Sequence, residues 1–541
     1  MIAAMRDALA LARNELVRGV VARGIRLLGA AFERESRARI AGYAREQARL
    51  RLVYGIEAET PIRTYDDQTR AAVEAWAEGH PGAQFATTSG STAQPKKIAF
   101  TRARLAAIKR ENFSVVARIA RRHRLERAGL FVLSGLAADD SLSSLLLEGA
   151  RAPGFLMGLL MPTRHVIRPE VAALVARYGP TAVRLWLLVL SDPGLLYCTN
   201  PSTLALFLAS LDDDWPAATA LIRDHIAGRL EAGPLRVARA IASSGWERRA
   251  RRIASSPVAL PAAELAPGLA VYVCWDGGYV RPYLDQVRAY LPPERFRQVP
   301  MYSMSTETLE TVLHFDGGEP RYLAMAPGVL YEFLPEDAPD ETARLLPPGA
   351  LEPGRVYAMV VSDGYGLRRY QTEDLFECRG RVGGVPDLRF LRRRGLTYSF
   401  TGEKLTDAQL VEAYARVREE FPALARAGVQ LAMIPSLPPG ERLPSYRLLL
   451  AHPGARPEEL DGAAVARRVD AHLATINREL AEKRASGRLG PTLAVVMRYD
   501  AAAAALEPRA RGVDASARAW DSQFKLLPLY RRLWHEHGLP G

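Results

Sequence analysis

The sequence predicts an α/β protein with a large N-terminal domain and a small α+β C-terminal domain. Residues 1–50 carry apolar side chains at helical spacing and almost no Gly or Pro. Residues 268–400 hold strand-like runs separated by glycines, and after Gly402 the pattern becomes helix, strand, strand, helix, strand. We therefore expect a boundary near residues 394–402 and define the two domains as residues 1–394 and 395–541.

The first 50 residues predict one or two amphipathic helices. The apolar residues that define them are Leu9, Leu11, Leu16, Val20, Val21, Leu27 and Leu28. A basic amphipathic helix could lie on a membrane surface. Packing of this apolar face against the body of the protein is the more common arrangement, and we expect it here.

Helices and strands alternate in the next 200 residues. Residues 61–67 look like a loop that leads into a helix, residues 85–97 like a short strand with a hydroxyl-rich loop, and a long helix is expected from Arg102. The apolar runs 131–133 and 185–190 are strand-like.

The C-terminal half contains more strands. In the N-terminal domain they are expected at residues 269–274, 355–362, 375–379 and 388–392. In the C-terminal domain we expect helices over 406–421 and 465–486, strands over 429–435, 445–451 and 492–498, and a surface loop from 501–505 onward.

The charge distribution and the cysteine content argue against several classes of protein, including nucleic-acid-binding and disulfide-rich proteins. The 541 residues include 72 Lys and Arg against 60 Asp and Glu, a net charge of +12 that invites a nucleic-acid interpretation. The arginines, however, are spread along the chain and alternate with acids, which argues against a nucleic-acid partner. Three widely spaced cysteines predict neither a disulfide framework nor a zinc site, and they fit a cytoplasmic setting. We expect no transmembrane helix and no signal peptide.

A hydroxyl-rich loop is the first candidate site. Thr87-Thr88-Ser89-Gly90-Ser91-Thr92 is followed by Lys96 and Lys97, so short donors and backbone amides stand close to a positive charge. That combination suits a polyphosphate, although the loop is not a Walker A motif. A Ser/Thr-rich surface turn is an equally good explanation for the loop taken alone.

Four further segments are candidates for the functional site only when they are considered together, because each has a simpler structural explanation by itself. Residues 301–307 could bring Glu307 to Mg²⁺ or simply begin a helix. Residues 362–374 form a Gly-rich turn between strands that ends at Asp374. Residues 390–404 lie at the domain boundary, where a charged linker is the simpler explanation. Lys525 follows Gln523-Phe524 near the C-terminus and is one of six lysines in an arginine-rich chain.

The order of these segments resembles the adenylate-forming superfamily, which includes acyl-CoA synthetases, luciferase and adenylation domains. Within it, the chain resembles the plant auxin- and jasmonate-conjugating acyl-acid-amido synthetases (the Gretchen Hagen family) and their bacterial relatives. The motifs that match this family are residues 88–97, 330–335, 366–374, 477–491 and 523–525. The resemblance implies that family's fold: a large N-terminal domain of β-sheets and a β-barrel flanked by helices, and a small mobile C-terminal domain.

The resemblance also implies roles for single residues. Thr88, Ser89, Gly90, Ser91, Thr92 and Lys97 would hold the ATP phosphates. Gly277 and the segment from Tyr302 through Thr306 to Glu307 would flank the adenine and the α-phosphate, with Glu307 toward Mg²⁺. Asp374 would bind the ribose hydroxyls with Arg393 behind it, and Arg394-Gly395 would be the hinge of the small domain. Lys525 would be the catalytic lysine of adenylation.

The expected activity is an ATP-dependent acid–amine ligase that uses small-molecule carboxylic acids and amines. It would make an acyl-AMP, release pyrophosphate and then form an amide, as a cytoplasmic monomer or homodimer without membrane insertion. Two alternatives stay open: thioester formation with CoA or a carrier protein, and a catalytically inactive nucleotide-binding homologue.

Overall fold

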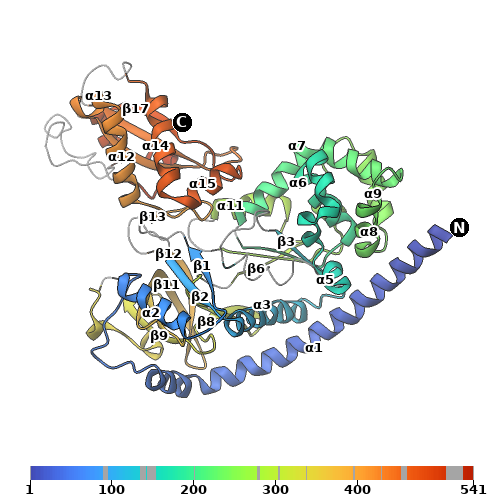
Figure 1. The fold of residues 1–541 in the computed structure, drawn as a ribbon, viewed down its shortest axis with the longest axis horizontal. Helices are drawn as coiled ribbons and strands as arrows, with labels where there is room; N and C mark the ends of the chain where they lie inside the picture. The colour runs from blue at the N-terminus through green and yellow to red at the C-terminus, as the bar shows by residue number, and fades with distance from the viewer. Residues whose placement is uncertain are drawn as a thin grey trace. The chain divides into compact units, whose positions relative to one another are not determined.

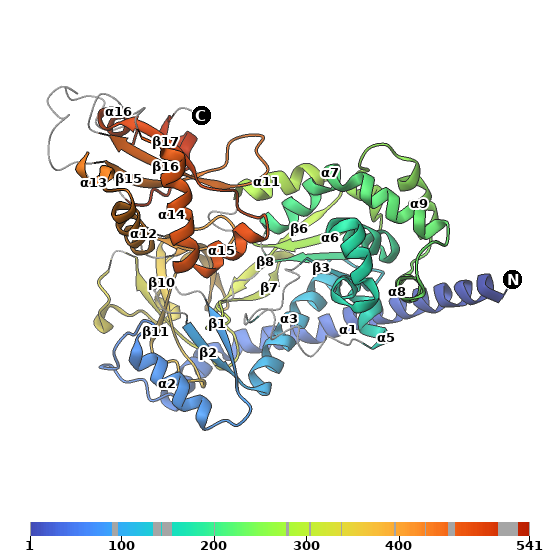
Figure 2. The ribbon, with the colours of Figure 1, turned by 45° about the horizontal axis from the view of Figure 1, so that its top comes forward.

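The computed structural model divides the chain into two compact units, one of residues 1–88 and 96–392 and one that begins at Arg393. It describes residues 2–88, 96–133, 142, 154–199, 201–276, 281–301, 305–336, 338–393, 397–427, 429–452, 460–506 and 528–539. Each unit mixes helices and strands (Figures 1 and 2), so the expected α/β class is confirmed.

The larger unit holds a parallel and an antiparallel sheet. The parallel sheet has the order β3-β4-β5-β6, and the strands of the expected barrel form a six-stranded antiparallel sheet of order β7-β8-β12-β11-β10-β9. β1 and β2 pair separately as antiparallel neighbours. The strands are β1 (Gln84–Thr88), β2 (Lys96–Phe100), β3 (Leu130–Leu133), β4 (Leu195–Cys198), β5 (Val271–Cys274), β6 (Arg297–Pro300), β7 (Val312–Asp316), β8 (Glu319–Leu323), β9 (Leu330–Pro335), β10 (Val356–Ser362), β11 (Tyr370–Val382) and β12 (Val385–Arg393).

Helices cover these sheets. α3 packs on the parallel sheet, since Val115, Ile119 and Ala120 share a buried cluster with residues of β4, β5 and β6. α7 contacts β4 and α11. The helices of this unit are α1 (Ile2–Val53), α2 (Asp67–Glu78), α3 (Arg102–Arg122), α5 (Phe155–Leu160), α6 (Pro169–Ser191), α7 (Pro201–Ile226), α8 (Ala232–Ile241), α9 (Trp246–Ser255), α10 (Ala262–Leu265) and α11 (Arg281–Tyr290), with 3₁₀ turns at Pro162–Ile167, Thr342–Arg344 and Pro348–Ala350.

The expectation for residues 185–190 was wrong, because this run lies in helix α6 and not in a strand. A short, wholly apolar run cannot show whether it is buried on all sides of a helix or on both faces of a strand. Within the described residues, α6 is the one helix long and apolar enough to cross a membrane by length and composition. Of its most apolar window, 56% is buried inside the protein, as in a core helix.

α1 is a single helix that lies along α3 (Figures 1 and 2). The two backbones come so close at Gly29 that a Cβ there would stand 2.4 Å from the carbonyl oxygen of Ala117. α1 packs against the body as expected, and Ile25 packs against the buried cluster around α3, but Leu9, Leu16, Val20 and Leu27 are exposed. α1 packs through its other face.

The smaller unit is the α+β assembly expected after Gly402. β15 pairs antiparallel with β16, and β16 pairs parallel with β17. Its elements are β13 (Thr397–Tyr398), β14 (Leu405–Thr406), α12 (Asp407–Glu420), α13 (Pro422–Arg426), β15 (Gln430–Ser436), β16 (Ser445–His452), α14 (Gly462–Ile476), α15 (Arg478–Ala485), β17 (Leu493–Arg498), α16 (Tyr499–Leu506) and a 3₁₀ turn at Trp534–His537.

Two expectations for this unit need correction. The helix predicted over residues 465–486 is broken at Asn477, which ends α14 and caps α15 by accepting a hydrogen bond from the amide of Leu480. Asn is a favoured helix cap, so it ends one helix as readily as it begins the next. The loop expected at 501–505 is helix α16, because consecutive alanines have high helix propensity.

A buried carboxylate organises the first loop of this unit. Glu403 is fully buried, and its carboxylate accepts hydrogen bonds from the amides of Phe400 and Thr401, both at 2.7 Å, and from the Tyr446 hydroxyl at 2.5 Å. Its backbone carbonyl accepts from the Asn477 side chain at 2.7 Å. One side chain therefore ties the 399–406 loop to β16 and to the start of α15.

We expect Glu403→Gln to lower the free energy of unfolding by about 2 kcal/mol, because Gln keeps one acceptor oxygen and its NH2 group would face the second backbone N–H donor. Tyr446→Phe should cost about 1 kcal/mol, since it removes one hydrogen bond from the same carboxylate. Denaturant unfolding of both variants checks this. Equal losses would contradict the central place of Glu403.

Candidate functional site

The structure describes part of the expected site. Thr88 is the last residue of β1, and Arg393 is the last residue of β12. Thr306, Glu307, Asp374 and Lys97 also lie in the described part. The remaining candidates lie outside the described residues: Ser89, Gly90, Ser91, Thr92, Gly277, Tyr302, the hinge at Arg394-Gly395, and Lys525.

Strand β2 separates its two lysines. Successive side chains of a strand point to opposite faces. Lys96 is 2% exposed, whereas Lys97, the lysine expected at the phosphates, is exposed. Lys97 is held through its backbone, which exchanges hydrogen bonds with the Tyr65 hydroxyl.

Lys96 lies in a buried polar cluster. Its Nζ is 3.2 Å from Glu307 Oε1 and donates to the Tyr370 hydroxyl at 2.8 Å. The Tyr370 hydroxyl in turn donates to Glu307 Oε1 at 3.1 Å. Glu373 Oε2 stands 3.8 Å from Lys96 Nζ. We name Lys96, Glu307 and Tyr370 the lysine cluster; all three are at least 95% buried, so the lysine and carboxylate charges neutralise each other away from water.

Arg104 fixes the backbone at Glu307. This arginine, in the first turn of α3, donates to the carbonyls of Glu307 at 2.7 Å and Ala99 at 2.8 Å. It also lies 3.4 Å from Asp363 Oδ2. Burial lowers the pKa of Arg104 and raises the pKa of Asp363, and each partner opposes the shift in the other. Segment 305–308 closes on itself, with the Ser305 amide donating to the Thr308 carbonyl at 3.1 Å.

β11 is irregular where it passes the lysine cluster. Ala358 of β10 pairs with Leu375 and Val360 pairs with Gln371, so residues 372–374 stand opposite one residue of β10. This bulge puts Glu373 at a φ of +65°. Bulges re-aim side chains next to functional sites. Glu373 faces Lys96, and Asp374, the expected ribose ligand, is half-buried directly after it.

Thr306 lines a cavity of about 180 Å³. Arg104, Asp363 and Tyr365 form its polar side, and Tyr365 lies against the guanidinium of Arg104 at 4.3 Å. The apolar side consists of Ala107, Ile108, Leu309, Ala326, Pro327 and Val329. A small pocket with one polar edge therefore lies on the same turn as Glu307.

Glu307 has limited capacity for a metal ion. Among the described residues, no group of three or more His, Cys, Asp or Glu side chains is arranged to hold one, and Glu307 Oε1 is already engaged by Lys96 and Tyr370. Mg²⁺ on a nucleotide keeps several waters and uses only one or two protein carboxylates. A single carboxylate is compatible with that mode, but it is not a magnesium site by itself.

Sequence reasoning missed several residues that build this region. The sequence places Lys96 and Lys97 together at the phosphate loop without separating their roles, and Tyr370 stands out only as part of a motif shared with the family. Strand alternation in the short β2 carries the signal that separates the two lysines. The buried contacts of Arg104 and Asp363 could not be predicted from the sequence, because their partners come from distant segments.

We expect Lys96→Met to lower the free energy of unfolding by about 3 kcal/mol, because it leaves the buried Glu307 carboxylate without its cation. Lys97→Met, one residue away on the exposed face, should change stability by less than about 0.5 kcal/mol. Adding Glu307→Gln to Lys96→Met should recover part of the loss. Thermal and denaturant unfolding measure all three, and strictly additive losses would refute the coupling.

Comparisons with known proteins find similarity over parts of the chain. Residues 322–393 match the model of the GH3 family central domain. The "Probable indole-3-acetic acid-amido synthetase GH3.9" of Oryza sativa subsp. japonica is 30% identical over 131 residues, 24% of this chain and 29% of that protein. The "Indole-3-acetic acid-amido synthetase GH3.3" of Arabidopsis thaliana is 30% identical over 96 residues, 18% of this chain and 16% of that protein. The aligned parts thus span less than a third of these relatives.

Among solved structures, "AtGH3.15 acyl acid amido synthetase in complex with 2,4-DB" aligns over 97% of this chain and 94% of its own, with 16% identity and a TM-score of 0.49. A 2-hydroxyisobutyryl-CoA ligase aligns over 98% of this chain and 90% of its own, with 14% identity and a TM-score of 0.37. The match to the family model covers residues 322–393, which include β9 to β12, Tyr370 and Asp374. Residues 322–393 are therefore similar to the central domain of the GH3 family.

Proposed function

We propose that this protein is an ATP-dependent acid–amine ligase that forms an acyl-AMP intermediate. The observation that carries the proposal is the position of the family match. The matched segment, residues 322–393, contains Asp374 and Arg393, the residues proposed for the ribose. Its Tyr370 hydroxyl lies 3.1 Å from Glu307 and receives a hydrogen bond from Lys96. The family segment thereby meets the two other segments that we assign to ATP.

The chemistry activates a poor acyl donor. A carboxylate oxygen attacks the α-phosphorus of ATP, the bond to the bridging oxygen breaks, and pyrophosphate leaves. The nitrogen of an amine then attacks the acyl carbon, AMP leaves with the former carboxylate oxygen, and the amine loses a proton. Both steps move negative charge onto phosphate oxygens, so fixed positive charges and N–H donors would lower their barriers.

We assign different residues to the parts of ATP and to the stabilisation of charge. We propose Thr88 to Thr92 with Lys97 for the ATP phosphates, Gly277 and Tyr302 to Glu307 for the adenine and α-phosphate, and Asp374 with Arg393 for the ribose. Lys525 is proposed as the lysine that stabilises charge during adenylation, and Arg394-Gly395 as the hinge of a mobile domain 395–541. Lys96 then acts as a positioning residue, because it holds Glu307 in place.

We also propose the substrates, the metal ion, the cellular location and the oligomeric state. The named relatives are indole-3-acetic acid-amido synthetases, so we propose an aryl- or alkyl-substituted carboxylic acid and an amino acid as the pair joined. Mg²⁺ would accompany the ATP phosphates, with Glu307 as its protein contact. We further propose a cytoplasmic monomer or homodimer that works without a nucleic-acid partner.

We expect acid-dependent exchange of labelled pyrophosphate into ATP when a panel of acids, indole-3-acetic acid included, is supplied. Lys525→Ala should reduce this exchange by about 10²–10³, the usual effect of losing one group that stabilises transition-state charge. Arg416→Ala, which removes an exposed positive charge from α12 of the same unit, is the matched control and should stay near wild type. Product mass spectrometry with pooled amino acids and with CoA then separates an amide from a thioester. No exchange with any acid would overturn the proposal.

We expect Asp374→Asn to raise the KM for ATP by about tenfold or more, since two charge-assisted hydrogen bonds to the ribose would weaken. The KM for the acid should change little. Glu377→Gln, farther along β11, provides the control for the strand itself. Steady-state kinetics with each substrate varied in turn test this, and an unchanged KM for ATP would remove Asp374 from the nucleotide site.

A further inference from the structure

α1 buries two polar side chains and leaves large apolar ones exposed within its first 30 residues. Ala10, Asn14, Arg18 and Ala22 are spaced four residues apart, so they lie on one side of the helix, and all are at least 91% buried. Asn14 donates to the carbonyls of Arg239 and Ala242 at 3.0 and 3.1 Å, and Arg18 donates to the carbonyls of Ile241 and Ala242. Burial lowers the pKa of Arg18 to about 10. The protein-facing side thus contains a buried polar pair, Asn14 and Arg18, that binds the carbonyls at the C-terminal end of α8.

The opposite side carries the large apolar residues. Their spacing alternates between four and seven residues, which places them along one side of the helix. Each is between 61% and 69% exposed: Met5, Leu9, Leu16, Val20 and Leu27. We call this the outer stripe. Soluble surfaces scatter such residues singly, whereas a continuous stripe marks an interaction site.

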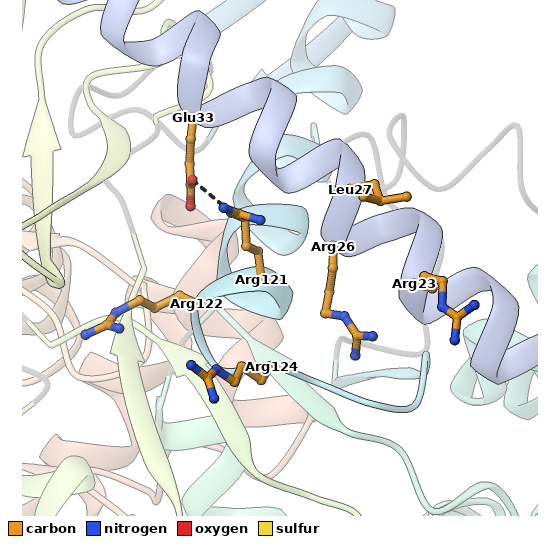
Figure 3. A pocket seen from close by; sticks show the side chains of 7 residues that line it. All are labelled: Arg23, Arg26, Leu27, Glu33, Arg121, Arg122 and Arg124. Carbon is orange, nitrogen blue, oxygen red and sulfur yellow. Dashed lines mark hydrogen bonds and ion pairs between the residues drawn. The ribbon is translucent and has the colours of Figure 1, made fainter.

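An arginine-lined pocket adjoins the outer stripe at Leu27. Figure 3 shows Arg23, Arg26, Leu27 and Glu33 projecting from α1, and Arg121, Arg122 and Arg124 from the end of α3 and the turn after it. The pocket measures about 580 Å³. Glu33 is the one acidic residue that lines it, and it pairs with Arg121 at 2.9 Å. The pocket therefore keeps a strong excess of positive charge beside an apolar stripe.

We propose that this face of α1 docks on the surface of an anionic lipid bilayer, with the outer stripe in the headgroup region and the arginines on lipid phosphates. Exposed aliphatic side chains beside basic ones are typical of helices that lie in the membrane interface without crossing it. Guanidinium groups bind phosphates in paired hydrogen bonds. The proposal goes beyond the ligase activity and does not depend on it.

The charge and the stripe together favour lipid over other partners. A nucleic acid would satisfy the arginines but would gain little from five exposed aliphatic side chains. A second copy would cover the stripe, but the stripe itself holds no acidic side chain that could pair with the arginines of the first copy. An anionic bilayer satisfies both features at once.

Flotation with lipid vesicles tests the proposal on the full-length chain. Wild type should float with phosphatidylcholine vesicles that contain phosphatidylglycerol, not with phosphatidylcholine alone, and added salt should weaken binding. Arg23→Gln with Arg124→Gln should reduce affinity about fivefold per arginine. Leu16→Ser with Leu27→Ser should reduce it roughly tenfold or more. All four side chains are exposed, and circular dichroism confirms folding.

Matched substitutions elsewhere on the same unit control for loss of charge and of apolar surface. Arg251→Gln with Val258→Ser changes an exposed arginine and an exposed valine on and after α9, and it should leave flotation unchanged. Equal binding to neutral and anionic vesicles would overturn the proposal. So would unchanged binding of the leucine variant, salt-sensitive binding to duplex DNA without flotation, or lipid-free dimerisation that the leucine variant abolishes.

Discussion

The buried contact between Lys96 and Glu307 is the constraint on which the candidate site depends. A lysine ammonium and a carboxylate can stay buried only when each meets the other or an equivalent partner. Here they are 3.2 Å apart, and the Tyr370 hydroxyl bridges them. Three segments separated by more than 60 residues must therefore reach one point: β2, the turn at 305–308, and the bulge of β11. The contact between these three segments also fixes the positions of Thr306 and Asp374, independently of which ligand these residues bind.

The same physical rule recurs at Arg104 and at Glu403. Arg104 holds two backbone carbonyls and the Asp363 carboxylate beside the cavity that Thr306 lines. Glu403 gathers two backbone amides and a tyrosine hydroxyl in the smaller unit. In each case one buried charge fixes a loop that has little regular structure of its own. Charged hydrogen bonds do this more strongly than neutral ones, and removing their partner leaves a costly unpaired group.

Periodicity predicted the helices and strands that are locally encoded. The helix from Arg102, the strands 356–362 and 445–452, and the helix capped by Thr406 lie within a few residues of their expected bounds. The run 185–190 failed because a fully buried element has no polar face to set its period. Lys96 and Lys97 were not separated, although alternation in β2 distinguishes them. The partners of Arg104 and Asp363 could not be predicted at all, since they exist only after distant segments meet.

In α1, the apolar spacing correctly predicts a helix but does not predict which of its residues are exposed. Its apolar spacing predicted a helix, and the helix is there, but the same spacing says nothing of which face meets the protein. Asn14 and Arg18 decide that, because the carbonyls at the end of α8 need donors and these two side chains supply them. Once Asn14 and Arg18 turn inward, Leu9, Leu16 and Leu27 on the opposite side must turn outward, since the two sides of one helix cannot move independently. The exposed stripe follows from that inward polar contact, and the arginines beside it give the stripe an electrostatic preference for an anionic surface.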